Sequence, residues 1–178
     1  MILAFSAFVA SASLATASFQ RALDSSAEWT MERTLPGAVR PLVSSGTVQC
    51  RKGEGIVWTT KSPFEASVEM TTNYMAFADE EGRRVKALAA LPHYAELRDA
   101  TDAFVAGKTD AFEGVFSLQE TEDSDGGWRV LLTPEVSAMK RLFVSVEITG
   151  AELPTNAVLK TESGGVSVIR FRERERAR

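Results

Sequence analysis

Short stretches in which apolar and polar residues alternate run through most of the chain. In residues 64–70 the even positions are apolar and the odd positions are polar, and residues 142–148 largely repeat this arrangement. Successive side chains of a β-strand point to opposite faces of the sheet, so each stretch predicts a strand with one apolar and one polar face. Such strands are typical of an antiparallel sheet whose apolar face is covered by another part of the protein.

Eleven β-rich runs, separated by Gly, Pro, Asn and Asp residues, are predicted as strands. Their bounds are Glu28–Thr34, Leu42–Arg51, Gly55–Thr60, Glu65–Thr71, Tyr74–Ala78, Arg84–Leu88, Val115–Thr121, Trp128–Thr133, Leu142–Thr149, Ala157–Glu162 and Val166–Arg172. Many short strands with turn signals between them are typical of a β-sandwich or a β-barrel. The turns at residues 79–82 and 123–127 are short enough to close antiparallel hairpins.

One segment departs from this alternation. Within Tyr94–Ala106, Leu97 and Phe104 lie near helical spacing, and the segment begins after Pro92 and ends before Gly107. Proline near the start and glycine just after the end are typical boundaries of a helix. The sequence therefore predicts one amphipathic helix here.

The predicted helices are too few to cover the predicted sheet. Besides the segment above, only a helical turn over residues 109–113 and a short helix over residues 134–140 are expected. Strands lie about 4.8 Å apart and a helix is about 10 Å across, so the sheet has to curl on itself. Its concave side is then either filled by side chains, as in small barrels, or partly open as a groove, and the alternation alone favours neither.

Residues 1–17 contain no charged side chain and end in Ala15-Thr16-Ala17. An apolar stretch that ends in small residues of this kind is typical of a secretory signal peptide. We expect cleavage after Ala17, which leaves a single domain, residues 18–178, outside the cytoplasm. The alternative is a buried N-terminal helix; a membrane span would require roughly 20 continuous apolar residues.

The composition fits a globular protein without a nucleic-acid partner. The chain has 178 residues, of which 44% are hydrophobic and 25% are charged, with a net charge of −4. One domain of this size buries a core without disulfides or metals. Proteins that bind nucleic acids normally carry a basic surplus that neutralises phosphates, and none is present here.

The sequence offers little catalytic chemistry. His93 is the only histidine, which is too few for the usual zinc ligand sets. A Ser-His-Asp triad would have to use that same residue, and no Gly-x-Ser-x-Gly turn is present. Cys50 is the only cysteine, and we expect it to pack as a small apolar side chain. We therefore expect no catalytic residues, no metal and no cofactor, with a small-barrel hydrolase as the least favoured alternative.

Several sequence pieces follow one another in an order that resembles the LolA-type outer-membrane lipoprotein carriers. In the first half they are RPLVSSG (40–46), RK (51–52), GIVW (55–58) and PF (63–64). In the second half they are FVAG (104–107) with Asp110, residues 112–116, GWRVLLTP (127–134), VEITG (146–150) and GGVSVIRF (164–171). The similarity extends over nearly all of residues 18–178 and is that of a divergent member.

The resemblance implies an unclosed, strongly curved antiparallel β-barrel of about eleven strands with a short helical lid. It implies a monomeric carrier in the periplasm that binds the acyl chains of lipoproteins in an apolar groove and takes them toward the outer membrane. An inner-membrane release transporter would load it and an outer-membrane acceptor would unload it. The alternative is a LolA-like accessory protein that binds another lipid, a glycolipid or an acyl product.

The resemblance also favours an open groove over a filled barrel, and the alternation then indicates the residues that line it. These candidate ligand-binding residues are Ile56, Trp58, Phe64, Val68, Met70, Leu97, Phe104, Val144 and Val146. In the family a basic residue after an early strand holds the lid closed through hydrogen bonds. The matching position in this chain is Arg51 or Lys52.

Overall fold

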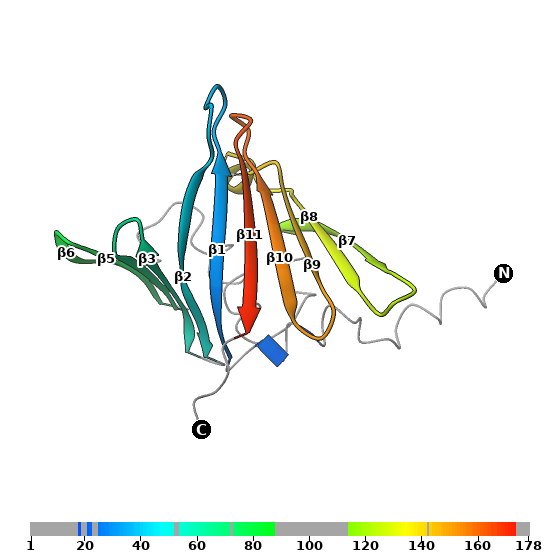
Figure 1. Ribbon diagram of the computed structural model, residues 1–178, viewed down its shortest axis with the longest axis horizontal. Helices are drawn as coiled ribbons and strands as arrows, with labels where there is room; N and C mark the ends of the chain where they lie inside the picture. Colours follow the sequence, from blue (N-terminus) through cyan, green and yellow to red (C-terminus); the bar gives the residue numbers. More distant parts are fainter. Residues whose placement is uncertain are drawn as a thin grey trace.

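The computed structural model describes residues 18, 21–22, 25–51, 54–71, 73–87, 114–141 and 143–173. Most of them belong to one antiparallel sheet of eleven strands (Figure 1). The strands are β1 (Ser26–Thr34), β2 (Leu42–Arg51), β3 (Gly55–Ser62), β4 (Ala66–Met70), β5 (Tyr74–Asp79), β6 (Gly82–Ala87), β7 (Phe116–Glu122), β8 (Trp128–Pro134), β9 (Ser145–Gly150), β10 (Pro154–Lys160) and β11 (Val166–Glu173). A short helix, α3 (Ser137–Lys140), follows β8.

The strand order in the sheet is β6-β5-β4-β3-β2-β1-β11-β10-β9-β8-β7. Strands that are consecutive in sequence lie side by side, except where β1 pairs with β11 from Ala27↔Glu173 to Thr34↔Val166. The first and last strands therefore meet in the middle of the sheet, and β6 and β7 form its edges. No pairing between β6 and β7 occurs in the described part of the chain, so the predicted unclosed antiparallel barrel is confirmed.

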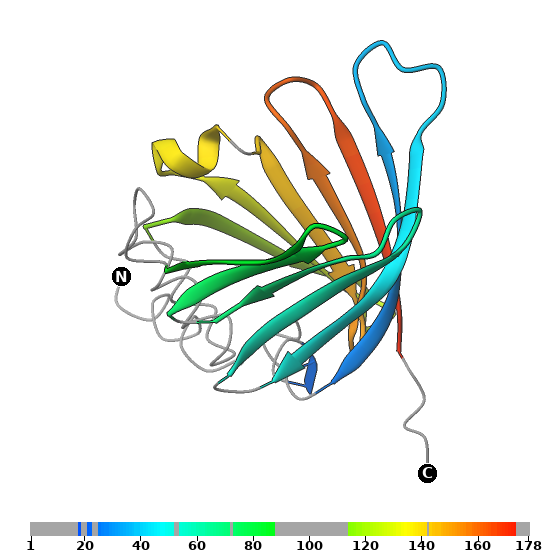
Figure 2. The ribbon, with the colours of Figure 1, turned by 90° about the vertical axis from the view of Figure 1, so that its left-hand side faces the viewer.

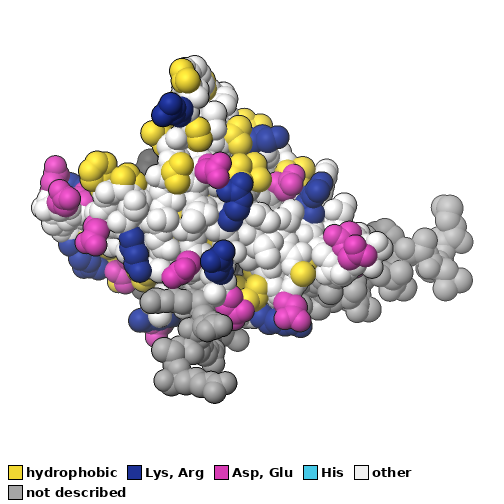
Figure 3. All heavy atoms as spheres, viewed as in Figure 1, with side chains coloured by type: hydrophobic (Ala, Val, Ile, Leu, Met, Phe, Trp, Pro, Cys, Tyr) yellow, Lys and Arg dark blue, Asp and Glu magenta, His cyan; other side chains and the backbone are white. Residues whose placement is uncertain are grey.

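The sheet is strongly curved, and Figure 2 shows the strands bending around a concave side. The convex face carries Lys, Arg, Asp and Glu side chains scattered over the central strands (Figure 3). Two clusters of buried residues share the opposite, concave face. One is built on Trp29, Ala157 and Ile169, and the other on Trp128 and its neighbours on β8. The core of the described residues thus lies inside the curve of the sheet.

All eleven predicted strands are present, with shifted ends. The largest shifts are at β9, which was expected from Leu142 and begins at Ser145, and at β10, which was expected from Ala157 and begins at Pro154. The amide of Phe143 donates to the carbonyl of Met139, and the amide of Val144 donates to the carbonyl of Lys160. At Phe143 the backbone therefore still belongs to the turn that follows α3, whereas Val144 already bonds to β10 one residue before β9 begins.

The short helix expected over residues 134–140 is confirmed as α3, which occupies its second half. The predicted signal peptide at residues 1–17, the helix at 94–106 and the helical turn at 109–113 lie outside the described residues. In the part of the chain that is described, no helix has the length and apolar character needed to cross a membrane.

Candidate functional site: an apolar cavity inside the sheet

A cavity of about 560 Å³ lies against the concave face, at the end of the sheet where β1, β3 and β10 begin. Antiparallel neighbours run in opposite directions, so the same end of the sheet also receives the last residues of β2, β9 and β11. The wall is mostly apolar and includes Val48, Ile56, Trp58, Ile148, Ala157 and Phe171. Polar residues that also line it are Ser25, Ser26, Glu152, Thr155 and Glu173.

The register of the strands explains why these side chains meet. Val48 of β2 lies opposite Trp58 of β3, and Phe171 of β11 lies opposite Trp29 of β1. Residues paired in this way project from the same face of the sheet. Trp29 also lies opposite Gly46 of β2. Because glycine has no side chain, β2 places no side chain between β1 and β3 at this position.

Two aromatic rings, Trp58 and Phe171, line the cavity, and a third ring, Trp29, is stacked against one of them. The Trp29 and Trp58 rings are stacked with centroids 4.8 Å apart, and Phe171 meets Trp58 edge-on at 6.1 Å. Offset stacking and edge-to-face contact are the favourable arrangements of aromatic pairs. The rings therefore give the cavity a rigid apolar side.

Cys50 lines the same cavity, one residue before the end of β2. Burial raises the pKa of its thiol to about 11, because a thiolate is poorly solvated among apolar side chains. The thiol is neutral at neutral pH and therefore weakly nucleophilic. Cys50 acts here as part of the apolar wall, in agreement with the expectation from the sequence.

Four of the candidate ligand-binding residues lie together on the concave face. Ile56 and Trp58 line the cavity. On the next strand, Met70 lies opposite Ile56 and Val68 lies opposite Trp58, so they extend the same apolar surface. Val146 also faces the concave side but packs against the Trp128 cluster, away from the cavity lining.

Two other candidates do not line the cavity. Phe64 lies in the turn between β3 and β4 and is 74% exposed, because β4 begins only at Ala66 and the alternation does not extend to the turn. Val144 precedes β9 and is 52% exposed. Leu97, Phe104 and Lys52 lie outside the described residues.

Arg51, the described member of the proposed lid-locking pair, forms an exposed ion pair with Glu54, with 3.4 Å between Nη1 and Oε2. Several wall residues were not identified from the sequence, including Val48, Ile148 and Ala157. The apolar positions of β11 were visible as alternation, whereas β2 reads as LVSSGTVQCR and shows no clean pattern.

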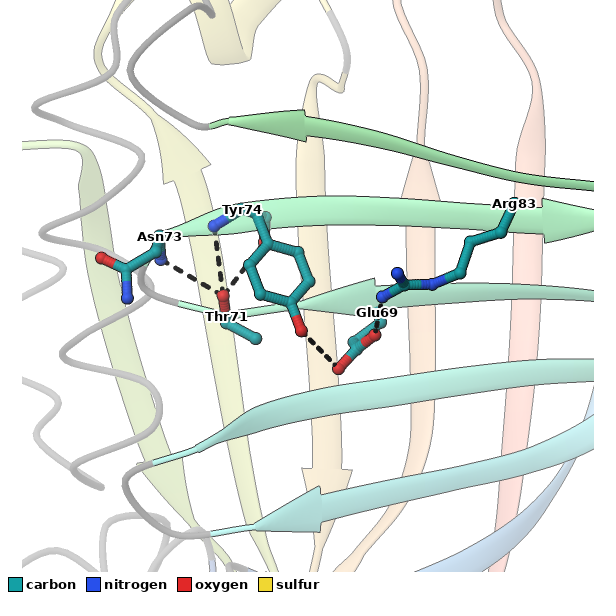
Figure 4. Close-up of polar contacts among 5 residues, drawn as sticks. All are labelled: Glu69, Thr71, Asn73, Tyr74 and Arg83. Carbon is teal, nitrogen blue, oxygen red and sulfur yellow. Dashed lines mark hydrogen bonds and ion pairs between the residues drawn. The ribbon is translucent and has the colours of Figure 1, made fainter.

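A polar cluster lies on the convex face of β4, β5 and β6 (Figure 4). The Tyr74 hydroxyl donates to Glu69 at 2.8 Å, and the Arg83 guanidinium donates to the other carboxylate oxygen at 2.9 Å. The hydrogen bond from Tyr74, with that from Arg83, lowers the pKa of Glu69, and the same bond to Glu69 raises the pKa of Tyr74. The three groups satisfy one another and link three neighbouring strands, which is a structural role.

Thr71 caps the turn beside this cluster. Its hydroxyl accepts hydrogen bonds from the amides of Asn73 and Tyr74, at 3.2 Å and 3.1 Å. A groove of about 350 Å³ runs along the turn, lined mainly by polar and charged residues. Within the described ranges, no group of three or more His, Cys, Asp or Glu side chains is placed to hold a metal ion.

The fold and the cavity together define an open antiparallel β-barrel with an apolar cavity on its concave face. The sequence matches no protein-family model and no curated protein. Solved structures with a similar course of the chain do exist. A LolA superfamily protein from Nitrosomonas europaea is 11% identical, with 89% of this chain and 90% of that chain covered and a TM-score of 0.44.

Two further structures are similar at the same level. An outer membrane lipoprotein-sorting protein domain from Vibrio parahaemolyticus is 10% identical, with 93% of each chain covered and a TM-score of 0.42. LprF from Mycobacterium bovis is 11% identical, with 93% of each chain covered and a TM-score of 0.40. All three are distant likenesses in the course of the chain, at identities of 10–11%.

Proposed function

We propose that this protein binds the acyl part of a lipid or lipoprotein in the cavity on its concave face and carries it without chemical change. The observation that supports the proposal is the cavity of about 560 Å³ with its apolar wall of aliphatic and aromatic side chains. Binding sites for small hydrophobic molecules are typically concave, mostly apolar and roughly 300–1,000 Å³ in volume.

The energetics of burial favour a long-chain ligand. Each methylene moved from water into an apolar site contributes about 0.8 kcal/mol. Association itself costs on the order of 4–15 kcal/mol. A chain of only a few carbons therefore does not offset this cost, whereas ten methylenes contribute about 8 kcal/mol and longer chains correspondingly more.

The finer parts of the proposal rest on the sequence resemblance. The cargo is an acylated lipoprotein, and the protein is an exported monomer that works in the periplasm. A release transporter of the inner membrane loads it, and an acceptor at the outer membrane unloads it. In a related function, the same cavity binds another lipid, a glycolipid or an acyl product. The identity of the bound molecule distinguishes this function from lipoprotein carriage.

The first experiment is native mass spectrometry of the protein purified from the periplasm of its host. Adducts with the masses of diacyl or triacyl species support lipoprotein carriage, and adducts of another lipid support the related function. Binding is then measured directly with a fluorescent fatty-acid probe. A protein that carries no adduct and fails to bind the probe contradicts the proposal.

A matched pair of variants assigns binding to the cavity. Ile56 lines the cavity, whereas its neighbour Val57 projects from the opposite face of β3 and is similarly half-buried. Ile56→Asn is expected to weaken probe binding by tenfold or more, because it places an amide among apolar atoms. Val57→Asn is expected to leave probe affinity unchanged. Equal effects of the two substitutions would place the binding site elsewhere.

A further inference from the structure

The hairpin that joins β1 to β2 projects from the end of the sheet opposite the cavity (Figure 1). Every residue of its tip, residues 33–43, is exposed. Among the described residues, eight large apolar side chains are exposed, and half of this set lies in the hairpin tip: Leu35, Val39, Leu42 and Val43. Single exposed apolar side chains are common, but a group of them on one projecting loop marks a surface that contacts another body.

The backbone of the hairpin tip has few unpaired donors. The amide of Ala38 donates to the carbonyl of Leu35 at 3.0 Å, and Gly37 has a φ of +76°. Proline followed by glycine at positive φ is typical of a type II turn. Pro36 and Pro41 have no amide hydrogen at all. Moving this tip out of water therefore leaves fewer donors unsatisfied than moving an ordinary loop would.

The charge of the hairpin tip is positive. Its only charged residues are Arg33 and Arg40, and neither forms an ion pair with another described residue. The nearest acidic residue in the sequence, Glu32, is already paired with Arg170. Hydrophobic and basic side chains lie together at the tip in Figure 3. The whole chain has a net charge of −4, so the tip differs in sign from the molecule that carries it.

From these observations we propose that the hairpin tip attaches the protein to the surface of a membrane that contains anionic phospholipids. Its aliphatic side chains enter the boundary between headgroups and acyl chains, roughly 5–10 Å deep. Arg33 and Arg40 bind lipid phosphates, for which the forked guanidinium group is well suited. The same anionic surface repels the remainder of the protein, so the attraction also orients the tip toward the membrane.

The shape of the hairpin tip favours a membrane over a protein partner. A projecting loop needs a matching hollow on a protein, whereas lipid headgroups rearrange around it. Attachment through the tip also leaves the cavity accessible, because the cavity is lined by Ser26 at the start of β1 and by Cys50 near the end of β2. The inference thus concerns a second surface and goes beyond the proposed function.

The test is co-sedimentation of the purified protein with two kinds of vesicle, one of phosphatidylcholine alone and one of equal parts phosphatidylcholine and phosphatidylglycerol. The wild type is expected to bind the mixed vesicles, to bind pure phosphatidylcholine far more weakly, and to be released by salt, which screens the attraction. Val39→Glu is expected to weaken binding to the mixed vesicles by roughly tenfold or more, because it removes an inserted aliphatic side chain. Arg40→Gln is expected to weaken it about fivefold.

Val85→Glu is the matched control. It makes the same substitution at another exposed valine, 53% exposed on the edge strand β6 and away from the hairpin tip. This variant is expected to bind the mixed vesicles as the wild type does. Thermal unfolding followed by circular dichroism checks that each variant is folded.

The outcomes separate this inference from the proposed function. A wild-type protein that does not bind the mixed vesicles would overturn the inference, as would equal binding by Val39→Glu and the wild type. Size-exclusion chromatography that shows a dimer dependent on Val39 would assign the tip to a second copy of the chain and would also overturn it. Binding of the fluorescent fatty-acid probe is measured separately without vesicles, and its loss in the wild type counts only against the proposed function.

Discussion

At the scale of single residues, the reactivity of the Cys50 thiol reports on access to the cavity. Cys50 is the only cysteine of the sequence, and burial against the cavity raises the pKa of its thiol to about 11. Alkylating reagents react with the thiolate, so their rate depends on both the pH and the access to the cavity. A ligand in the cavity covers this thiol.

We predict slow alkylation of Cys50 by iodoacetamide at pH 8, faster alkylation as the pH rises toward 11, and slower alkylation at every pH when an acyl ligand is bound. Alkylation is quantified by mass spectrometry of the intact protein, with the urea-unfolded chain as the reference for full exposure. Labelling as fast in the folded protein as in urea would contradict the buried position. Labelling unaffected by a saturating ligand would place the ligand outside this cavity.

The same pKa shift couples the thiol to folding. The thiol ionises at about 11 in the folded protein and at its ordinary value of 9.0 when exposed, so the unfolded chain loses this proton first as the pH rises. The contribution to stability is therefore complete below pH 9 and is lost between pH 9 and 11. Cys50→Ala, compared with the wild type over this range, isolates the contribution from that of other groups.

At the same scale, the sequence pattern predicted some residues of the cavity and missed others. Alternation identified Ile56 and Trp58, because both lie within a strand whose pattern is local. It could not identify Trp29 as a neighbour of the cavity, since that depends on the pairing of β1 with β11. Phe64 fits the alternation of β4 but lies before its first residue, where the backbone is a turn.

At the scale of elements, the junction between β1 and β11 holds the two halves of the sheet together. It combines an ion pair on the convex face with apolar packing on the concave face. Arg170 Nη1 lies 2.7 Å from Glu32 Oε1, with both side chains about half exposed. On the opposite face, Ile169 is 8% exposed and packs in the Trp29 cluster.

We predict that the apolar contact stabilises this junction far more than the ion pair does. Ile169→Ala is expected to lower the free energy of unfolding by roughly 2–5 kcal/mol, the usual effect of removing a buried aliphatic side chain. Arg170→Ala, one residue away, is expected to cost less than about 1 kcal/mol, because exposed ion pairs contribute little. Urea unfolding of both variants measures the difference, and a larger loss for Arg170→Ala would contradict it.

Most elements could be predicted from the sequence because each strand and turn has a local signal. Short turns also determine which consecutive strands form hairpins, and nine of the ten strand pairings join consecutive strands. The remaining pairing, β1 with β11, joins residues such as Glu32 and Arg170 that are 138 positions apart. No local pattern specifies such a contact. The number of strands predicted a sheet that curls on itself, and the family resemblance predicted that the barrel is unclosed.

At the scale of the whole molecule, the position of a strand in the sheet is expected to set its local stability. β1 and β11 lie in the middle with a partner on each side, whereas β6 and β7 form the edges of the described sheet. All residues of β6 are exposed. Strands with few buried contacts open locally at a lower free-energy cost than the core.

We predict the slowest amide hydrogen exchange in β1, β2, β10 and β11, and the fastest strand exchange in β6 and β7. Bound ligand should slow exchange most in the strand ends that surround the cavity, with little change at the opposite ends. Hydrogen exchange with mass spectrometry, with and without an acyl lipid, gives both comparisons. Exchange in β6 and β7 as slow as in β1 would show that other parts of the protein cover these edges.

The unjoined edges have one more consequence, which concerns the size of the ligand. In a closed barrel, the number and stagger of the strands fix the circumference. Here the ring is interrupted between β6 and β7, and ten strand pairings separate them along the sheet. A change of a few degrees in twist at each pairing adds up along the sheet and breaks no hydrogen bond. We therefore expect the interior to widen or narrow as the twist changes, so that ligands of different width fit the same cavity.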